Sequence, residues 1–163
     1  MAKSGAPSQY YSILGLEKNI SAEWNGGVNY PADLVIYTAA PNDARQNIPV
    51  DEWSKNVAKY LSTVRAVDNG KTDILFCLPH NGNHDLTNFV YQDYVARGRG
   101  LADAYGAAFI DLWSIGRNSW DYWNSLGYWG DLSNPGAVGT DVIHMSDAGH
   151  KFMADTVLPV LNA

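Results

Sequence analysis

The stretch Asp73–Leu78, with the sequence DILFCL, decides the fold because its apolar residues follow one another without the polar alternation of a half-exposed strand. An unbroken apolar run of this length is typical of a parallel strand that is covered on both faces. Two similar runs flank it along the chain, at Asp33–Tyr37 and at Ala108–Leu112. We therefore predict three buried parallel strands.

Segments with helical periodicity separate and follow these runs. Residues 49–70 carry apolar side chains at helical spacing. A second such segment covers residues 87–105 and is expected to be interrupted at Gly98 and Gly100, and a third follows Ser146. Strands that alternate with helices predict an α/β fold with a parallel sheet. In such a fold, functional groups collect in loops at the carboxyl ends of the strands.

Composition excludes several classes of protein. The chain of 163 residues is long enough for one substantial core, so residues 1–163 are predicted to form a single domain. It has a net charge of −6, and its eleven Lys and Arg residues are scattered, which argues against a nucleic-acid partner. No apolar run approaches the about 18 residues of a transmembrane helix, so no membrane partner is expected either.

Aromatic residues and the lone cysteine give weaker signals. The chain has six Trp and ten Tyr, many of them in a Trp-rich segment over residues 113–145 that we expect to be a long loop. Such a surplus is compatible with a surface that faces a sugar, although aromatic residues also serve packing. Cys77 lies inside an apolar run, where a buried thiol is the ordinary interpretation and a nucleophile the rarer one.

The most specific feature precedes the last predicted helix, where Asp141 comes three residues before His144. An Asp at this spacing can accept a hydrogen bond from the imidazole and orient its other nitrogen toward a substrate, which a general base requires. Ser146 is placed to cap the following helix and to anchor this loop. The alternative is that Asp141 caps a turn and that His144 is an ordinary surface histidine.

Two further positions could stabilise an oxyanion. Asn42 directly follows the first predicted strand, where its amide can donate to a developing negative charge, although Asn followed by Asp is also common in turns. Gly5 lies in a short Ser-Gly-Ala sequence, where a glycine lets a backbone N–H approach a ligand closely. Taken alone, Gly5 could equally belong to a flexible terminus.

In this order, the pieces resemble the sequence blocks of the SGNH (GDSL) hydrolase superfamily. Asp141 and His144 match its Asp-x-x-His block, Asn42 lies in a match to its Gly-x-Asn-Asp block with Ala40 in place of glycine, and Gly5 fits its second block. The resemblance implies a three-layer α/β/α fold with a flavodoxin-like parallel sheet. It also implies a catalytic His144–Asp141 pair, an oxyanion hole of Asn42 and Gly5, and no cofactor.

The block with the nucleophile, Gly-Asp-Ser, has no match at the expected place. The Gly130–Asp131 pair lies in the Trp-rich segment and is predicted to be a turn. We therefore expect the first strand or strands to be missing from this chain, and a segment or chain outside it to supply the serine along Asp33–Tyr37. Ser4 is the alternative nucleophile, with Asn25-Gly26-Gly27 as the second block, but that alignment leaves too few residues between this second block and the strand at Asp33 for a crossover helix.

A metal site is the remaining chemistry to weigh. His80 and His84, with Asn83 and Asp85, follow the second predicted strand, yet no third His or Glu falls at a known companion spacing. A polar loop at the rim of a substrate cleft is the better interpretation. We expect no metal.

The resemblance implies a serine esterase or deacetylase that acts through an acyl-enzyme on an O-acetylated carbohydrate or a small ester. Phage-tail proteins and secreted polysaccharide esterases are the members it looks like, which favours an extracellular or virion-associated location by analogy. The alternative is a non-catalytic carbohydrate-binding or structural module on a decayed esterase scaffold.

Overall fold

Three parallel strands form the centre of the molecule. The computed structural model describes residues 32–38, 40–67, 69–78, 88–117, 119–130 and 144–162. Within these ranges the sheet has the order β1-β2-β3, with β1 at Leu34–Tyr37, β2 at Asp73–Leu78 and β3 at Ala108–Asp111. Both neighbouring pairs are parallel. The three predicted strands are therefore confirmed, with small differences at their ends.

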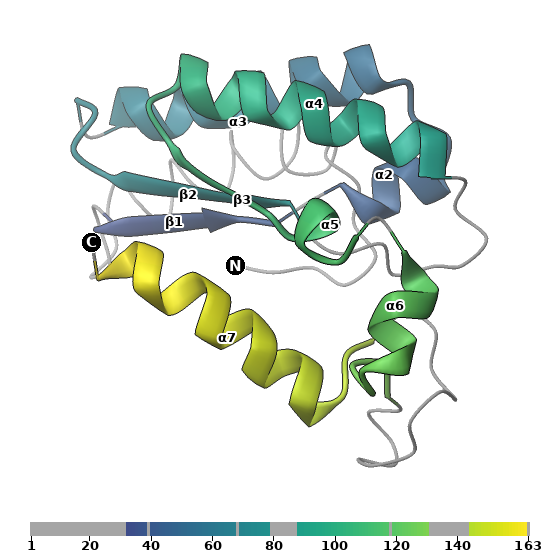
Figure 1. The fold of residues 1–163 in the computed structure, drawn as a ribbon. Helices are drawn as coiled ribbons and strands as arrows, with labels where there is room; N and C mark the ends of the chain where they lie inside the picture. The colour runs from purple at the N-terminus through teal and green to yellow at the C-terminus, as the bar shows by residue number, and fades with distance from the viewer. Residues whose placement is uncertain are drawn as a thin grey trace.

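Helices cover both faces of this sheet, as Figure 1 shows. On one face lie α3 (Val50–Val67) and α4 (Asn88–Ala104), and on the other lies α7 (Asp147–Leu161). The architecture is thus a three-layer α/β/α arrangement. None of the helices in the described ranges is long and apolar enough to cross a membrane.

Each face of the sheet has its own core, because successive strand residues point to opposite sides. Ile74, Phe76 and Leu78 of β2 pack toward α3 and α4, where Trp53 and Tyr94 are fully buried. Leu75 and Cys77 pack with Ile110 and Leu112, and Met153 and Val157 of α7 cover them. Burial on both faces explains why the β2 sequence is apolar throughout.

The two glycines of α4 do not interrupt the helix, contrary to the expectation from sequence. A Cβ on Gly98 would lie 2.7 Å from Cδ1 of Leu78 and 3.1 Å from Cε1 of Phe76. Gly98 therefore lets α4 lie directly on β2. Its role is close packing rather than a helix break.

The segment after β3 also differs from its prediction. Instead of one long loop it contains α5 (Leu112–Ile115) and α6 (Trp120–Ser125). Trp113, Trp123 and Trp129 are buried, and the latter two pack with Phe152 and Met145 in a core of their own. These three tryptophans therefore serve packing, which was one of the two interpretations of the aromatic surplus.

Candidate active site

The loops that follow the strands gather at one end of the molecule. Figure 1 shows α2 (Pro41–Arg45), α5, α6 and the amino-terminal end of α7 on the side toward which the strand arrows point. This is the carboxyl edge of the sheet, where ligand sites of open α/β folds lie. Asn42 belongs to α2, and His144 directly precedes α7.

Asn42 is positioned by a single helical turn after β1. Pro41 begins α2, and its fixed φ suits the first helical position. Ala40, which stands where the resemblance expects glycine, has a φ of 169° and is 1% exposed. This φ is extended and open to any residue, so the departure from glycine introduces no backbone strain, and the core accommodates the methyl group.

The backbone around His144 is held by a short antiparallel pairing with residues 128–130. The Gly130 N–H donates to the His144 carbonyl oxygen at 3.1 Å, and the Ser146 N–H donates to the Tyr128 carbonyl oxygen at 2.8 Å. Trp129 and Met145 form a bridge between the two segments. The loop that carries His144 is therefore fixed to a buried aromatic core.

Ser146 adds the predicted helix cap. Its Oγ accepts from the Gly149 N–H at 3.2 Å and donates to the Gly127 carbonyl oxygen at 2.6 Å. One side chain thus joins the start of α7 to the turn after α6. The cap predicted from sequence is confirmed.

Gly130 has a structural reason to be glycine. A Cβ there would lie 2.9 Å from both Cα and Cβ of Ser146. The close approach of the two segments therefore requires glycine at this position. Close packing against Ser146 is thus sufficient to explain the glycine at position 130, and Gly130 need not belong to a Gly-Asp-Ser nucleophile block.

The structure describes two of the four predicted site residues, His144 and Asn42. His144 is exposed and Asn42 is half-buried, and both lie at the carboxyl end of the sheet. Asp141, Gly5 and the alternative nucleophile Ser4 lie outside the described residues, and so do His80 and His84. The His144–Asp141 hydrogen bond and the role of Gly5 therefore stay predictions.

The buried hydroxyl groups of Tyr91 and Tyr94 stay neutral at ordinary pH. Burial and the nearby carboxylates of Asp111 and Asp43 hold the pKa of Tyr91 well above its usual value. Burial, followed by the Asp43 and Glu52 carboxylates, raises the pKa of Tyr94 to about 12. The two tyrosines are thus hydrogen-bond donors rather than bases.

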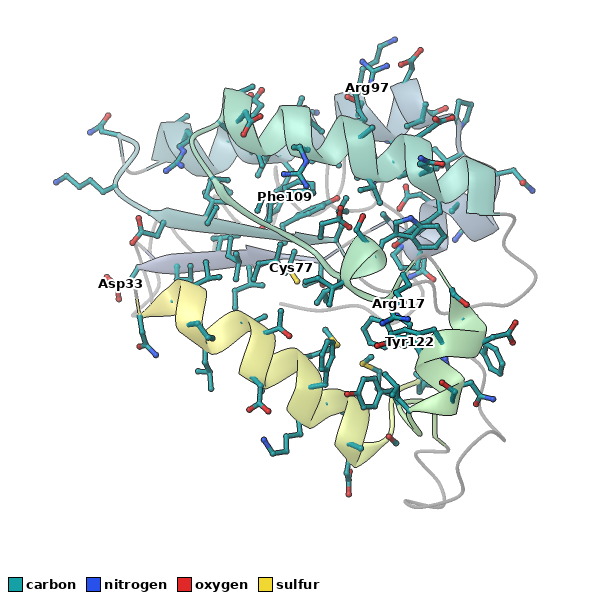
Figure 2. All side chains as sticks on the ribbon, viewed as in Figure 1. Asp33, Cys77, Arg97, Phe109, Arg117 and Tyr122 are labelled. Atoms are coloured by element: carbon teal, nitrogen blue, oxygen red, sulfur yellow. The ribbon has the colours of Figure 1, made fainter. Side chains whose placement is uncertain are left out.

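Two contacts at this edge were not predicted from the sequence. Asp111 caps α5 by accepting from the Ser114 N–H at 2.9 Å and from its hydroxyl at 2.7 Å. The Arg117 guanidinium lies 4.3 Å from the centre of the Tyr122 ring, and Figure 2 shows this pair facing each other between α5 and α6. An Asp that ends a strand two residues before a Trp-Ser pair was the only available signal.

Within the described ranges, His, Cys, Asp and Glu side chains form no group of three or more that could hold a metal ion. Among the described residues, His144 and His150 carry exposed imidazoles.

A sequence model described as the GDSL-like lipase/acylhydrolase family matches residues 2–152. The parallel sheet with helices on both faces agrees with the three-layer fold expected from this match. Comparisons with curated proteins and with solved structures gave no match.

Proposed function

The chain belongs to the GDSL-like lipase/acylhydrolase family, and on this premise we propose that it is a serine esterase or deacetylase. One observation supports the proposal most. The exposed His144 sits on a loop whose flanking backbone is hydrogen-bonded to residues 128–130, at the same end of the sheet as Asn42. A general base and an oxyanion donor must be held in this way to act on one carbonyl group.

The proposed reaction proceeds through an acyl-enzyme. His144, oriented by Asp141, accepts the proton of a serine hydroxyl as the serine oxygen attacks the ester carbonyl carbon. The Asn42 amide and the Gly5 N–H donate to the oxyanion that forms. The ester C–O bond then breaks, and the alcohol leaves with the proton from His144. A water molecule repeats the sequence and releases the acid.

We propose further that the nucleophilic serine comes from a segment outside this chain. Among the strands of the described ranges, β1 pairs only with β2, so its other edge has no partner there. Leu34 and Ile36 are 37% and 48% exposed, although they lie on a strand of a parallel sheet. A strand whose edge has no partner strand among the described residues, and whose apolar face is only partly covered, favours pairing with another strand.

The acyl group is proposed to be carried by a carbohydrate, as in phage-tail or secreted carbohydrate esterases. Three tryptophans of the Trp-rich segment are buried and cannot contact a sugar. The aromatic side chains there that support a carbohydrate substrate are therefore the partly exposed Trp120 and Tyr122, with Arg117 beside Tyr122. Aromatic faces of this kind can pack on a sugar ring. Acetate release from an O-acetylated polysaccharide, compared with p-nitrophenyl acetate, would test the preference directly.

Labelling with a serine-directed fluorophosphonate, followed by peptide mapping, tests the origin of the nucleophile. We expect the label on a serine of the complementing segment. A label on Ser4 would overturn the segment proposal and keep the esterase. Failure to label any serine, together with no hydrolysis of p-nitrophenyl acetate, would favour the non-catalytic alternative.

A further inference from the structure

The helix that carries Asn42 is too short to hold its own orientation. With five residues, α2 is far below the about 12 residues that an isolated helix needs for marginal stability in water. Asn47, shortly after it, has a φ of 54°, so the chain turns sharply there. Contacts from elsewhere in the fold must therefore fix the direction of the Asn42 amide.

One such contact comes from α4. The Tyr94 hydroxyl donates a hydrogen bond to the Ile48 carbonyl oxygen. The N–H of Ile48 in turn donates to the Asp43 carbonyl oxygen at 3.0 Å, and the Gln46 N–H donates to the Asn42 carbonyl oxygen at 3.0 Å. A continuous series of hydrogen bonds thus joins Tyr94 to the turn that contains Asn42.

The Tyr94 ring cannot easily move away from this position. Tyr94 is fully buried, its ring centre lies 5.1 Å from that of Trp53 on α3, and it stacks on Tyr91 at 6.3 Å. Asp43, beside Asn42, is also fully buried. Burial and the Asp43 carboxylate keep the hydroxyl protonated, because they raise the pKa of Tyr94 to about 12.

We propose that Tyr94 is a positioning residue that holds α2 through Ile48 and so aims the Asn42 amide at the oxyanion. This inference rests on the proposed esterase function, since it deepens the role given to Asn42. It concerns a residue that lies on a different helix and has no place in the sequence blocks of the resemblance. Tyr94 itself is not expected to touch the substrate.

The experiment uses Tyr94→Phe, which keeps the ring and removes only the hydroxyl. Tyr105→Phe is the matched control, because the Tyr105 hydroxyl bonds to Ser62 Oγ at 2.8 Å at the opposite end of α4. In the complete enzyme we expect kcat for p-nitrophenyl acetate to fall about tenfold in Tyr94→Phe, with KM nearly unchanged, since a small misalignment of a donor weakens transition-state binding. Tyr105→Phe should keep the wild-type kcat.

Two readouts separate positioning from simple loss of stability. In an Asn42→Ala background, Tyr94→Phe should cause no further fall in kcat, because the group it orients is already absent. Hydrogen exchange at the Gln46 and Ile48 amides should accelerate in Tyr94→Phe, while exchange at Leu75 of β2 stays unchanged.

Unchanged exchange at Gln46 and Ile48, or a tenfold loss that persists in the Asn42→Ala background, would overturn the inference. Absence of esterase activity in the wild-type enzyme would instead overturn the proposed function. The exchange measurement does not depend on activity, so the two failures are distinguishable.

Discussion

Gly149 lets the first turn of α7 lie close to the segment that holds the loop of His144, the candidate general base. A Cβ at this position would lie 2.4 Å from the Tyr128 carbonyl oxygen, which itself accepts the hydrogen bond from the Ser146 N–H. Contacts under 3 Å are not tolerated by a methyl group, so the backbone would have to move. The first turn of α7 would separate from residues 128–130, and His144 lies on the same loop.

We therefore predict that Gly149→Ala destabilises the protein by about 1–3 kcal/mol, the usual cost of forced overpacking. Urea denaturation measures this free energy of unfolding. Gly100→Ala is the control, because nothing lies within 4 Å of a Cβ there and α4 is continuous through it. Alanine should stabilise that exposed helical position by about 0.5–1 kcal/mol. Equal effects of the two substitutions would refute the packing argument.

Some of these residue contacts could be predicted and others could not. The Ser146 cap follows from local sequence, because the hydroxyl oxygen of a serine just before a helix can accept from an unpaired N–H of the first turn. The hydrogen bond from Tyr94 to Ile48 joins residues 46 positions apart, and only the fold brings them together. Asp141 and Gly5 were assigned from residue type and spacing together with the resemblance, and they lie outside the described residues.

At the scale of the elements, β2 carries a buried thiol whose ionisation is linked to folding. Burial raises the pKa of Cys77 from 9.0 to about 11, and Figure 2 shows Cys77 between the sheet and α7. Because the folded pKa is the higher one, this contribution to stability is fully present below pH 9. It is lost as the pH rises toward 11.

The free energy of unfolding should therefore fall between pH 9 and pH 11, and it should fall less steeply in Cys77→Ala. The difference between the two slopes corresponds to about 2–3 kcal/mol over the interval. Tyr94 titrates in both proteins and cancels in the comparison, whereas Cys77 is one of the groups that raise the pKa of Tyr91, so a part of the difference between the slopes comes from this coupling. Parallel slopes would contradict the assignment of this pH dependence to Cys77.

Arg65 joins three elements at the end of the sheet opposite the candidate site. Its guanidinium donates to the carbonyl oxygens of Thr72 at 2.6 Å, Tyr105 at 2.7 Å and Gly106 at 2.8 Å. These contacts connect the end of α3 to the turns before β2 and before β3. Lysine has no planar fork of donors and cannot reproduce them.

Arg65→Lys should lower the free energy of unfolding by about 2 kcal/mol, within the range for hydrogen bonds to a charged group. Arg97→Lys is the control, because Arg97 forms an ion pair with Asp51 on the outer side of α4, where both side chains are more than half exposed. Such surface pairs contribute about 0–1 kcal/mol. If Arg97→Lys lowered the free energy of unfolding as much as Arg65→Lys, the stabilising role given to the Arg65 hydrogen bonds would be contradicted.

Periodicity was sufficient to predict the main elements but not the segment between β3 and α7. The helices α3, α4 and α7 have 18, 17 and 15 residues, long enough for apolar side chains at helical spacing to be recognised, and the strands are continuous apolar runs. By contrast, α5 and α6 contain four and six residues, too few for a periodic signal. Their tryptophans are buried through contacts with one another and with α7, which local sequence does not encode.

At the scale of the whole molecule, the exposed side of β1 is the place where a further strand would complete the sheet. Ile36→Lys should leave the free energy of unfolding of this chain nearly unchanged, because Ile36 is 48% exposed. If the nucleophile comes from the proposed serine-bearing segment, Ile36→Lys should prevent docking of that segment and so abolish serine labelling. Leu126→Lys is the control, since Leu126 is 43% exposed but lies after α6. Normal labelling of Ile36→Lys would contradict docking along β1.

The central claim is that His144 is the general base of an ester hydrolase. The measurement that tests it most directly is the rate of p-nitrophenyl acetate hydrolysis by the complete enzyme with His144→Ala, beside His150→Ala. His150 is also exposed and lies in the first turn of α7, so it controls for the loss of an imidazole near the same loop. If His144 is the general base, we expect His144→Ala to lower kcat by a factor of about 10⁴–10⁶ and His150→Ala to keep the wild-type rate. Wild-type turnover by a correctly folded His144→Ala variant would contradict it.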